Sequence, residues 1–380
     1  MLRIIPLAHS ARPMCSHSKL TVITMSKRNA HDLMIRKKTG KPIVSSGAGG
    51  RSSVSGHVAT VFGCTGFLGR YVTHKLAKIG TQVITPYRDE EAQRPLKVMG
   101  DLGQVVKMEF DLRNREQLVE CIRHSDIVYN IIGRDYETKN FSFDDVHVEG
   151  ARAIAEICRE VGTPRLVHVS ALNADENSPS KFLRSKALGE KVVKEIVPDA
   201  TIVRPATMYG YDDRFLNRMG SRRGTQFLLN EGKTRLRPVH VLDVAEAMFI
   251  MLNAESTIGK TFELYGSQEY TYKQIWDLIA DLSKRQPKEV HIPVPLAKAV
   301  ATVLDKLPWP VLSPDQITRA LISDEPSANA HTFADLLIEP HRLEDVAIQF
   351  VRRFRSSNYF DQPLEKGDGE VKKGVYHVVN

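Results

Sequence analysis

Cysteine is scarce in this chain, which has four cysteines among its 380 residues. They stand far apart at positions 15, 64, 121 and 158, without a CxxC pair or a nearby histidine cluster. This spacing argues against a disulfide framework and against the common zinc-binding sequence patterns. We therefore expect free thiols and no metal site.

A long uninterrupted apolar run is also missing. The most apolar late stretch, Ile292–Leu312, contains Lys298, Asp305, Lys306 and four prolines, which argues against a membrane-spanning helix. The overall composition is ordinary for a globular protein, with 42% hydrophobic and 26% charged residues. The sequence thus predicts a protein that is soluble or peripheral to a membrane.

Acidic residues are absent from residues 1–30, which combine arginine, lysine, serine and apolar residues. This composition is typical of a mitochondrial transit peptide. We expect such a peptide at about 1–30, a flexible arm rich in glycine, serine and lysine at 31–55, and import into mitochondria. The alternative is a basic arm that stays attached to the protein.

The formal net charge of +8 has a local origin. Residues 1–55 hold ten lysines and arginines and a single acid, Asp32, whereas the remaining chain has 43 basic and 44 acidic residues. The near-neutral body lacks the broad basic surface of a nucleic-acid-binding protein. No nucleic acid partner is therefore expected.

Short apolar runs alternate with amphipathic segments from residue 57 onward. The expected strands are HVATVFG, QVITPYR, QVVKMEF, DIVYNIIG, RLVHVSA and TIVRPA, with helices between them. This order predicts an α/β fold, a doubly wound parallel Rossmann sheet over 56–210. The less regular region 211–380 predicts a smaller irregular cap, with a loop at 222–238. The boundary near 210 is soft, because later segments can return to the sheet edge.

A glycine-rich turn follows the first of these strands and precedes a helix. Its residues that we expect to bind a dinucleotide are Gly63, Thr65, Gly66, Phe67, Leu68 and Gly69. The glycines allow a tight turn and a close approach to pyrophosphate, and the helix N-terminus offers free N–H groups. The alternative is a purely structural tight turn.

The end of the second expected strand distinguishes NAD(H) from NADP(H). An acid there would bind the ribose 2′-hydroxyl of NAD, but this strand ends with Arg88, which can pair with a 2′-phosphate. NADP(H) is therefore favoured. Asp89 and Glu90 follow directly, so a slip of one or two residues would restore an acid, and Arg88 would then be a solvated turn residue.

These motifs together resemble the extended or atypical short-chain dehydrogenases/reductases. The resemblance implies adenine contacts at Asp111 and Leu112, a cofactor-lining position at Ile132, and the family serine at Ser170. It continues through the later segments RPATMYG and VHVLDVAEAM. In the second of these segments we expect Asp243 to cap the N-terminus of the following helix.

The catalytic pair of that family is Tyr-x-x-x-Lys, with the phenol as general acid and base. The matching residues here are Phe182 and Lys186. Phenylalanine cannot transfer a proton, and the loss of a positioned acid costs about 10²- to 10⁴-fold in rate. We therefore expect Lys186 to bind the cofactor and no residue to act as a catalytic group.

Longer runs resemble a narrower family, the NADPH-containing accessory subunits of mitochondrial respiratory complex I. The similar runs include NIIGRDYETKNFSFDDVHVEGARAIA and FLRSKALGEKVV. The resemblance implies tightly bound NADPH, a role in assembly or stability of the complex, and a place on the matrix side of the inner membrane near the junction of its two arms. Other subunits of the complex would then be the partners.

An apolar helical stripe is expected at positions 296, 300, 303, 304 and 307. It could lie against a membrane subunit or lipid headgroups, or it could pack on its own cap domain. The sequence is also compatible with two other functions. One is a free mitochondrial NADP-dependent reductase or epimerase, and the other is a redox-sensing or RNA-associated scaffold.

Overall fold

The computed structural model describes residues 31–35, 42–47, 50, 52–221, 225–285, 288–305, 312–327, 329–355 and 359–360. The expected transit peptide at 1–30 lies outside these residues.

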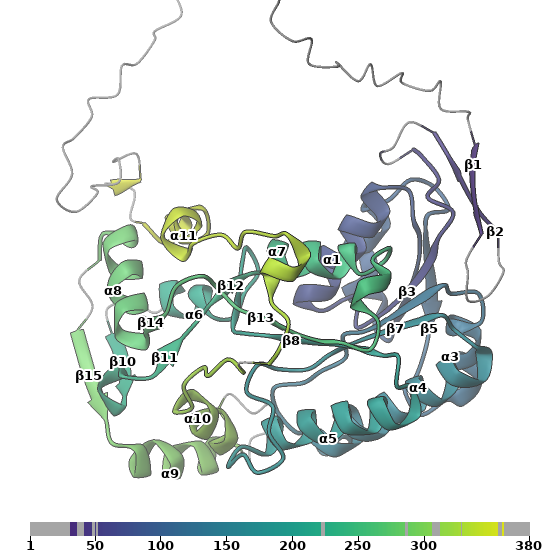
Figure 1. Ribbon diagram of the computed structural model, residues 1–380. Coiled ribbons are helices and arrows are strands. Elements are labelled where there is room, and N and C mark those ends of the chain that lie inside the picture. The colour runs from purple at the N-terminus through teal and green to yellow at the C-terminus, as the bar shows by residue number, and fades with distance from the viewer. Residues whose placement is uncertain are drawn as a thin grey trace, which may run out of the picture.

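Seven parallel strands form one central sheet (Figure 1). In spatial order they are β13 (Thr261–Leu264), β8 (Thr201–Pro205), β7 (Arg165–Val169), β6 (Ile127–Asn130), β3 (Val58–Phe62), β4 (Gln82–Tyr87) and β5 (Val105–Glu109). The chain order reverses between β3 and β6, and ligands of open α/β sheets bind at the carboxyl edge beside such a point. The predicted Rossmann-type fold is confirmed.

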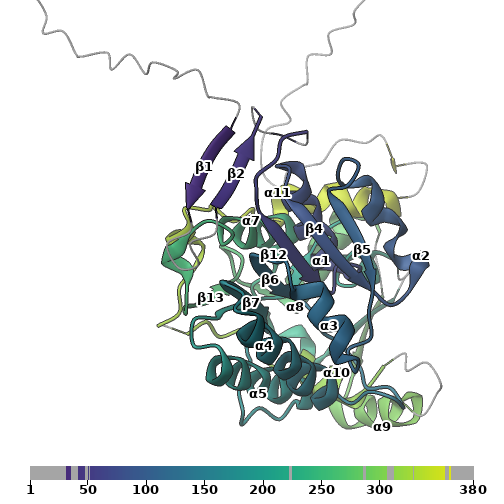
Figure 2. The same ribbon diagram turned by 90° about the vertical axis from the view of Figure 1, so that its right-hand side faces the viewer.

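Helices cover both faces of the sheet, as the two views in Figures 1 and 2 show. The helices on one face are α1 (Phe67–Lys78) and α7 (Val241–Ile250), and those on the other are α3 (Arg115–Ile122), α4 (Gly150–Val161) and α5 (Lys181–Ile196). In α1 the buried residues Leu68, Val72 and Leu76 recur every four positions, so one apolar stripe faces the sheet. With both faces covered, the inner strands can be apolar along their whole length.

Two elements beyond residue 210 belong to the sheet layer. The edge strand β13 pairs with β8, and α7 packs beside α1. The Rossmann unit therefore does not end at 210, and the later segments do return to it.

The remaining elements form the cap. Its helices are α6 (Leu216–Ser221), α8 (Tyr272–Ser283), α9 (Val294–Leu304), α10 (Pro314–Ala320) and α11 (Leu343–Val351). Its strand pairs are β9 (Met208–Tyr209) with β12 (Val239–His240), β10 (Thr225–Leu229) with β15 (Lys288–Ile292), and β11 (Arg235–Leu236) with β14 (Tyr270–Thr271). A separate core, which includes Ile275, Trp276 and Phe350, holds α6, α8 and α11 together.

The segment 222–238 is not a continuous loop as expected, because it contains β10 and β11. In β10, Gln226 and Leu228 are buried while Phe227 between them is 39% exposed, so the strand has one buried face. Two alternating positions in a five-residue strand give too short a pattern to recognise in the sequence.

The expected arm at 31–55 also contains regular structure. Its two strands, β1 (His31–Ile35) and β2 (Pro42–Ser46), pair antiparallel, and Ser46 forms a further bridge to Val54. Ile43 of β2 is 3% exposed, so this segment is anchored by at least one buried apolar side chain.

Of the described members of the expected apolar stripe of α9, Leu304 is half-buried and the other three are exposed. Ala297 and Ala301 are buried, whereas Leu296, Val300 and Val303 are 57%, 49% and 69% exposed. The last expected member of the stripe, at position 307, lies outside the described residues. Within the described chain, no helix is both long enough and apolar enough to span a bilayer.

Candidate functional site

The glycine-rich turn joins β3 to α1 at the carboxyl edge of the sheet. Gly63 has a φ of +81°, which favours glycine, and its carbonyl accepts a hydrogen bond from the Gly66 N–H at 3.0 Å. A Cβ added to Gly69 would lie 2.1 Å from the Gly63 carbonyl oxygen. Any side chain at position 69 would therefore push α1 away from the strand.

The first turn of α1 offers free hydrogen-bond donors at this edge. Its N-cap, Gly66, provides no side-chain cap, and the turn contains no acidic residue. The N–H groups of Phe67, Leu68 and Gly69 have no intrahelical acceptors, and the helix dipole adds partial positive charge. This arrangement, with Thr65 half-buried in the turn, suits a pyrophosphate group.

Arg88 follows the last residue of β4 and is exposed at the same edge. The acid that follows it, Asp89, is the N-cap of the short helix α2 (Glu90–Gln93), where its carboxylate accepts a hydrogen bond from the Glu91 N–H at 3.1 Å. Asp89 therefore caps α2. The Arg88 guanidinium has no observed partner among the described residues.

Asp111 and Leu112 follow β5, the neighbour of β4. The Asp111 carboxylate accepts a hydrogen bond from the Arg113 N–H at 3.0 Å, which fixes the local turn. Leu112 packs against Gly150 of α4, where an added Cβ would lie 2.7 Å from a Leu112 methyl carbon. Ile132 follows β6, and its N–H lies 3.2 Å from the position of a Cβ on Gly63.

Lys186 reaches from α5 to the ends of β6 and β7. It is 5% exposed, and its Nζ donates to the Val169 carbonyl at 3.1 Å. The same Nζ lies 3.2 Å from where a Cβ of Gly133 would stand. Burial lowers the pKa of Lys186 to about 8, against the charges of Glu190 and Asp135, which raise it.

Ser170 lies directly after β7, beside that carbonyl. Its hydroxyl is buried and has no hydrogen-bond partner among the described residues. A buried polar group in this state is usually satisfied by something that the protein alone does not supply. Ser170 and Lys186 therefore fit a ligand with hydroxyl groups, such as the nicotinamide-bearing ribose of a dinucleotide.

Phe182 occupies the position of the missing phenol and is half-buried among other side chains. Its ring centroid lies 5.2 Å from that of His147 and 5.9 Å from that of Phe143. The guanidinium carbon of Arg319, from α10, lies 4.2 Å from the centre of the Phe182 ring. A cation above the ring is a favourable contact, and here it covers the ring with the protein's own side chain.

The helix α10 is held over this position by several polar contacts. Asp315 accepts hydrogen bonds from the Ser180 hydroxyl at 3.0 Å and from the Lys181 N–H at 2.7 Å, at the start of α5. Arg319 also lies 3.6 Å from the carboxylate of Asp135, in the loop after β6. The cap is thus tied to the start of α5 and to the loop after β6.

His147 does not replace the missing acid. Its Nε2 accepts a hydrogen bond from the Arg134 N–H at 3.2 Å, and its Nδ1 lies 2.8 Å from the Ser185 hydroxyl. Burial, and then the charge of Lys186, lower the pKa of His147 to about 2. The imidazole is therefore neutral, with both nitrogens already occupied.

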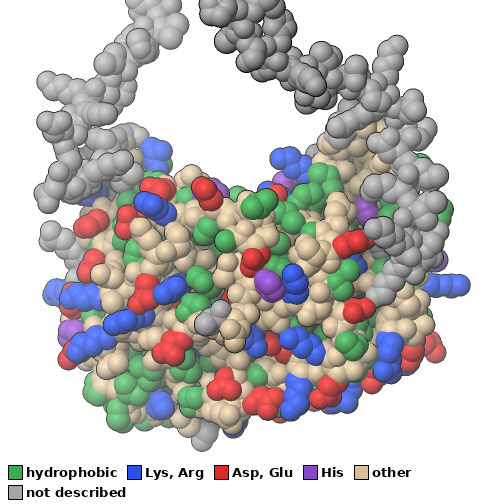
Figure 3. Space-filling view, in the orientation of Figure 1, with side chains coloured by type: hydrophobic (Ala, Val, Ile, Leu, Met, Phe, Trp, Pro, Cys, Tyr) green, Lys and Arg blue, Asp and Glu red, His purple; other side chains and the backbone are tan. Residues whose placement is uncertain are grey.

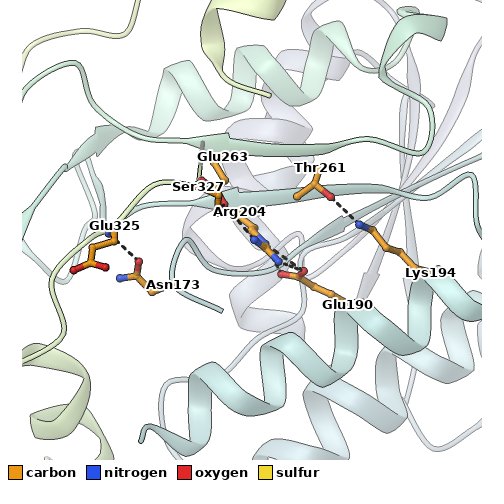
Figure 4. A network of polar contacts seen from close by, with 8 residues as sticks. All are labelled: Asn173, Glu190, Lys194, Arg204, Thr261, Glu263, Glu325 and Ser327. Carbon is orange, nitrogen blue, oxygen red and sulfur yellow. Dashed lines mark hydrogen bonds and ion pairs between the residues drawn. The ribbon is translucent and has the colours of Figure 1, made fainter. Parts of the chain in front are cut away.

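A network of charged groups lies between α5 and the strands β8 and β13 (Figure 4). Arg204 of β8 pairs with Glu190 of α5 at 2.7 Å and with Glu263 of β13 at 3.2 Å. An open depression of about 510 Å³ beside it is lined by both acidic and basic side chains of α5. None of the expected cofactor-binding residues lines this depression. The network joins α5 to the sheet edge, and the charge of its Glu190 opposes the lowering of the Lys186 pKa.

Asp243 is not the N-cap of its helix, as the sequence suggested. His240 is the N-cap of α7, and Asp243 lies in the first turn. Its carboxylate accepts a hydrogen bond from the backbone N–H of His341 at 2.8 Å and contacts the His341 Nδ1 at 2.6 Å.

Sequence reasoning missed His147, Asp315 and Arg319. His147 lies in a π-helical turn, Asp145–Glu149, and no motif indicated it. Asp315 and Arg319 act through α10, which is more than 130 positions from Phe182 and Ser180 in the sequence and carries no recognisable signal of its own.

This chain matches a known protein family and is similar in sequence to several curated proteins. Residues 59–264 match the model of the NAD dependent epimerase/dehydratase family. The chain is 46% identical over 339 residues to the mitochondrial NADH-ubiquinone oxidoreductase 40 kDa subunit of Neurospora crassa, with 89% of each chain covered. It is 41% identical over 335 residues to the mitochondrial NADH dehydrogenase (ubiquinone) 1 alpha subcomplex subunit 9 of Rattus norvegicus, with 85% of this chain and 87% of the rat protein covered.

A solved structure supports the fold at lower sequence identity. The Citrobacter sp. triphenylmethane reductase complexed with NADP(H) has a TM-score of 0.61 and 18% identity, with 77% of this chain and 99% of the reductase covered. At this identity the likeness concerns the fold alone.

Replacing Gly69 with alanine tests the dinucleotide site. The added methyl group would meet the Gly63 carbonyl, so we expect Gly69→Ala to lose at least about ten-fold in nucleotide affinity, since about 1.4 kcal/mol suffices for that factor. Nucleotide released from purified protein by heat is quantified by chromatography. Gly162→Ala is the matched control: it strains a left-handed C-cap at the opposite edge of the sheet, at a cost of about 1 kcal/mol, and should keep its nucleotide. Full occupancy in Gly69→Ala would contradict the assignment.

Proposed function

We infer a function from the family to which this chain belongs, the NAD dependent epimerase/dehydratase family. Within that family it belongs to the mitochondrial 40 kDa (alpha subcomplex 9) subunits of NADH-ubiquinone oxidoreductase. We propose that it is an accessory subunit of that complex and that it holds NADPH without turning it over. The observation that carries the second half of this proposal is Phe182, which stands in place of the catalytic phenol beneath Arg319.

The cofactor would lie along the carboxyl edge of the sheet. The N-terminus of α1 would bind the pyrophosphate and Arg88 the 2′-phosphate, with Asp111 and Leu112 near the adenine. Lys186 and Ser170 would bind the ribose next to the nicotinamide, and their burial keeps water from that end. NADPH supplies hydride chemistry in other members of such folds. Here the site has groups to bind and orient the cofactor but lacks a proton donor at position 182.

The contribution of the cofactor would be structural. Its contacts reach the turns after β3, β4, β5, β6 and β7, so a bound molecule would link five strand ends. Anything that binds only the folded state stabilises that state. The nucleotide would therefore favour the folded subunit and the surface that it offers to the complex.

The partners would be other subunits of the complex, on the matrix side of the inner membrane near the junction of the two arms. One surface suits a position against lipid headgroups. The exposed residues Leu296, Val300 and Val303 of α9 give a green patch at the lower left of Figure 3, where α9 lies in Figure 1. Lys298 on the same helix could contact anionic headgroups.

Isolation of the native particle tests the main proposal. The chain should migrate with NADH dehydrogenase activity on native electrophoresis of mitochondrial membranes, and mass spectrometry should find NADP(H) released from that band. A chain that migrates alone contradicts the role as a subunit.

In the variant Arg88→Glu, a carboxylate would repel the 2′-phosphate, and we expect a loss of about 10- to 100-fold in NADPH affinity. Arg94→Glu, at a nearby exposed position, should bind normally.

A free reductase or epimerase is the second candidate, favoured by the buried Lys186 and by Ser170. Restoring the phenol with Phe182→Tyr separates the two functions. We expect no NADPH consumption with carbonyl or sugar-nucleotide substrates, because the Arg319 guanidinium lies over one face of the ring and would compete with a substrate there. A gain of 10²- to 10⁴-fold over the unmodified chain would favour the reductase. The double variant Phe182→Tyr/Lys186→Met should then lose that gain, since the lysine assists the phenol.

Vesicle binding tests the surface of α9. The unmodified chain should sediment with vesicles of phosphatidylcholine and phosphatidylglycerol, and Val303→Asp should reduce the bound fraction several-fold by placing a charge on the apolar face. Thr302→Asp adds the same charge at the adjacent exposed position, off the stripe, and serves as the control. Equal binding by the two variants would contradict a lipid-facing role for this stripe.

A further inference from the structure

Two histidines and an aspartate meet where α7 begins, at the seam between the sheet layer and the cap. They are His240, Asp243 and His341, and one potential ligand atom from each lies within 4.8 Å of the other two. His240 and Asp243 belong to the start of α7, whereas His341 belongs to the segment that leads into α11. Asp243 and His341 are 98 positions apart in the sequence.

His240 is a buried imidazole with an unused nitrogen. The residue is 5% exposed, and its Nδ1 has no hydrogen-bond partner among the described residues. Its ring packs against Tyr209 and Phe350, with centroids 5.3 and 5.7 Å away. Burial lowers the pKa of His240, although Asp243 opposes this shift, so the neutral form that a metal requires is favoured.

His341 provides the accessible side of the cluster. Its side chain is 57% exposed, whereas that of Asp243 is 6% exposed. The contact between its Nδ1 and the Asp243 carboxylate, at 2.6 Å, brings a second imidazole and an anionic oxygen together. An ion could enter from the solvent side of His341 without disturbing the buried rings.

We propose that His240, Asp243 and His341 bind one divalent transition-metal ion of the Zn²⁺ type, with water at the remaining position. Two imidazole nitrogens and one carboxylate oxygen form a ligand set that Zn²⁺ accepts, with bonds of about 2.0–2.2 Å and ligand atoms about 3.3 Å apart in a tetrahedron. Rotation of the exposed His341 side chain would adjust the distance of its nitrogen from the other two ligand atoms, and rotation of the Asp243 carboxylate would adjust the separation from His240, which lies within 4.8 Å. The ion would replace the proton shared by Asp243 and His341.

Such an ion would join the start of α7 to the segment before α11, and so would fasten the cap to the sheet layer. Within the described part of the chain, no other set of three His, Cys, Asp or Glu ligand atoms lies this close together. Binding to the folded state alone would raise the melting temperature. This inference does not depend on the proposed function, because none of the three ligands is among the residues proposed to bind the dinucleotide.

Calorimetric titration of the purified full chain with ZnCl₂ tests the site, after removal of metal with a chelator and with the nucleotide kept in place. We expect one equivalent bound, together with a higher melting temperature. Asp243→Asn keeps a hydrogen-bond acceptor for His341 but removes the anionic ligand, and we expect its affinity to fall at least ten-fold. His341→Gln, at a half-exposed position, should behave in the same way.

His331→Gln is the matched control. His331 and Asp335 form an exposed pair at 3.1 Å without a third ligand, so this variant should bind Zn²⁺ like the unmodified chain. The proposal is overturned if the unmodified chain binds no stoichiometric Zn²⁺, or if Asp243→Asn and His341→Gln bind it with unchanged affinity. Melting curves recorded without metal show whether each variant is folded before it is titrated.

Discussion

The approach of α1 to the end of β3 is the contact on which the site depends. Gly69 comes so close to the Gly63 carbonyl that no side chain fits between them. This packing directs the first N–H groups of α1 toward the reversal point of the sheet, where the strand ends converge. Were the helix displaced, the N–H donors of its first turn would no longer lie beside the ends of β4 and β6, near the other residues of the proposed cofactor site.

Binding and catalysis are separable in this architecture because they use different parts of it. The strand ends and α1 carry the proposed dinucleotide site, whereas proton transfer in the family would require one hydroxyl on α5. A phenylalanine stands at the position of that hydroxyl, and it contacts two further rings and Arg319. A fold of this kind can therefore lose the catalytic hydroxyl and keep the residues proposed to bind the dinucleotide, as the proposed role in a larger assembly requires.

The sequence predicted the features that arise from local pattern. Continuous apolar strands, helices of regular spacing and a glycine turn between them identify the sheet and its carboxyl edge, and the placement of Arg88 after β4 follows the expected register. Features made by distant segments could not be predicted. The contact of Arg319 with Phe182 and the pairing of Asp243 with His341 each join positions about a hundred or more apart. The short strand β10 shows too few alternating positions to be recognised.

The late return of β13 to the sheet has a consequence for how the chain unfolds and tolerates truncation. The sheet edge is completed only after the chain has passed through β9, β10, β11 and β12 of the cap. A chain cut at residue 210 would leave β8 as an open edge, with unpaired backbone groups that favour aggregation. Segments of the sheet layer and of the cap thus alternate along the chain. We expect the two to unfold as one cooperative unit, unlike domains joined end to end by a linker.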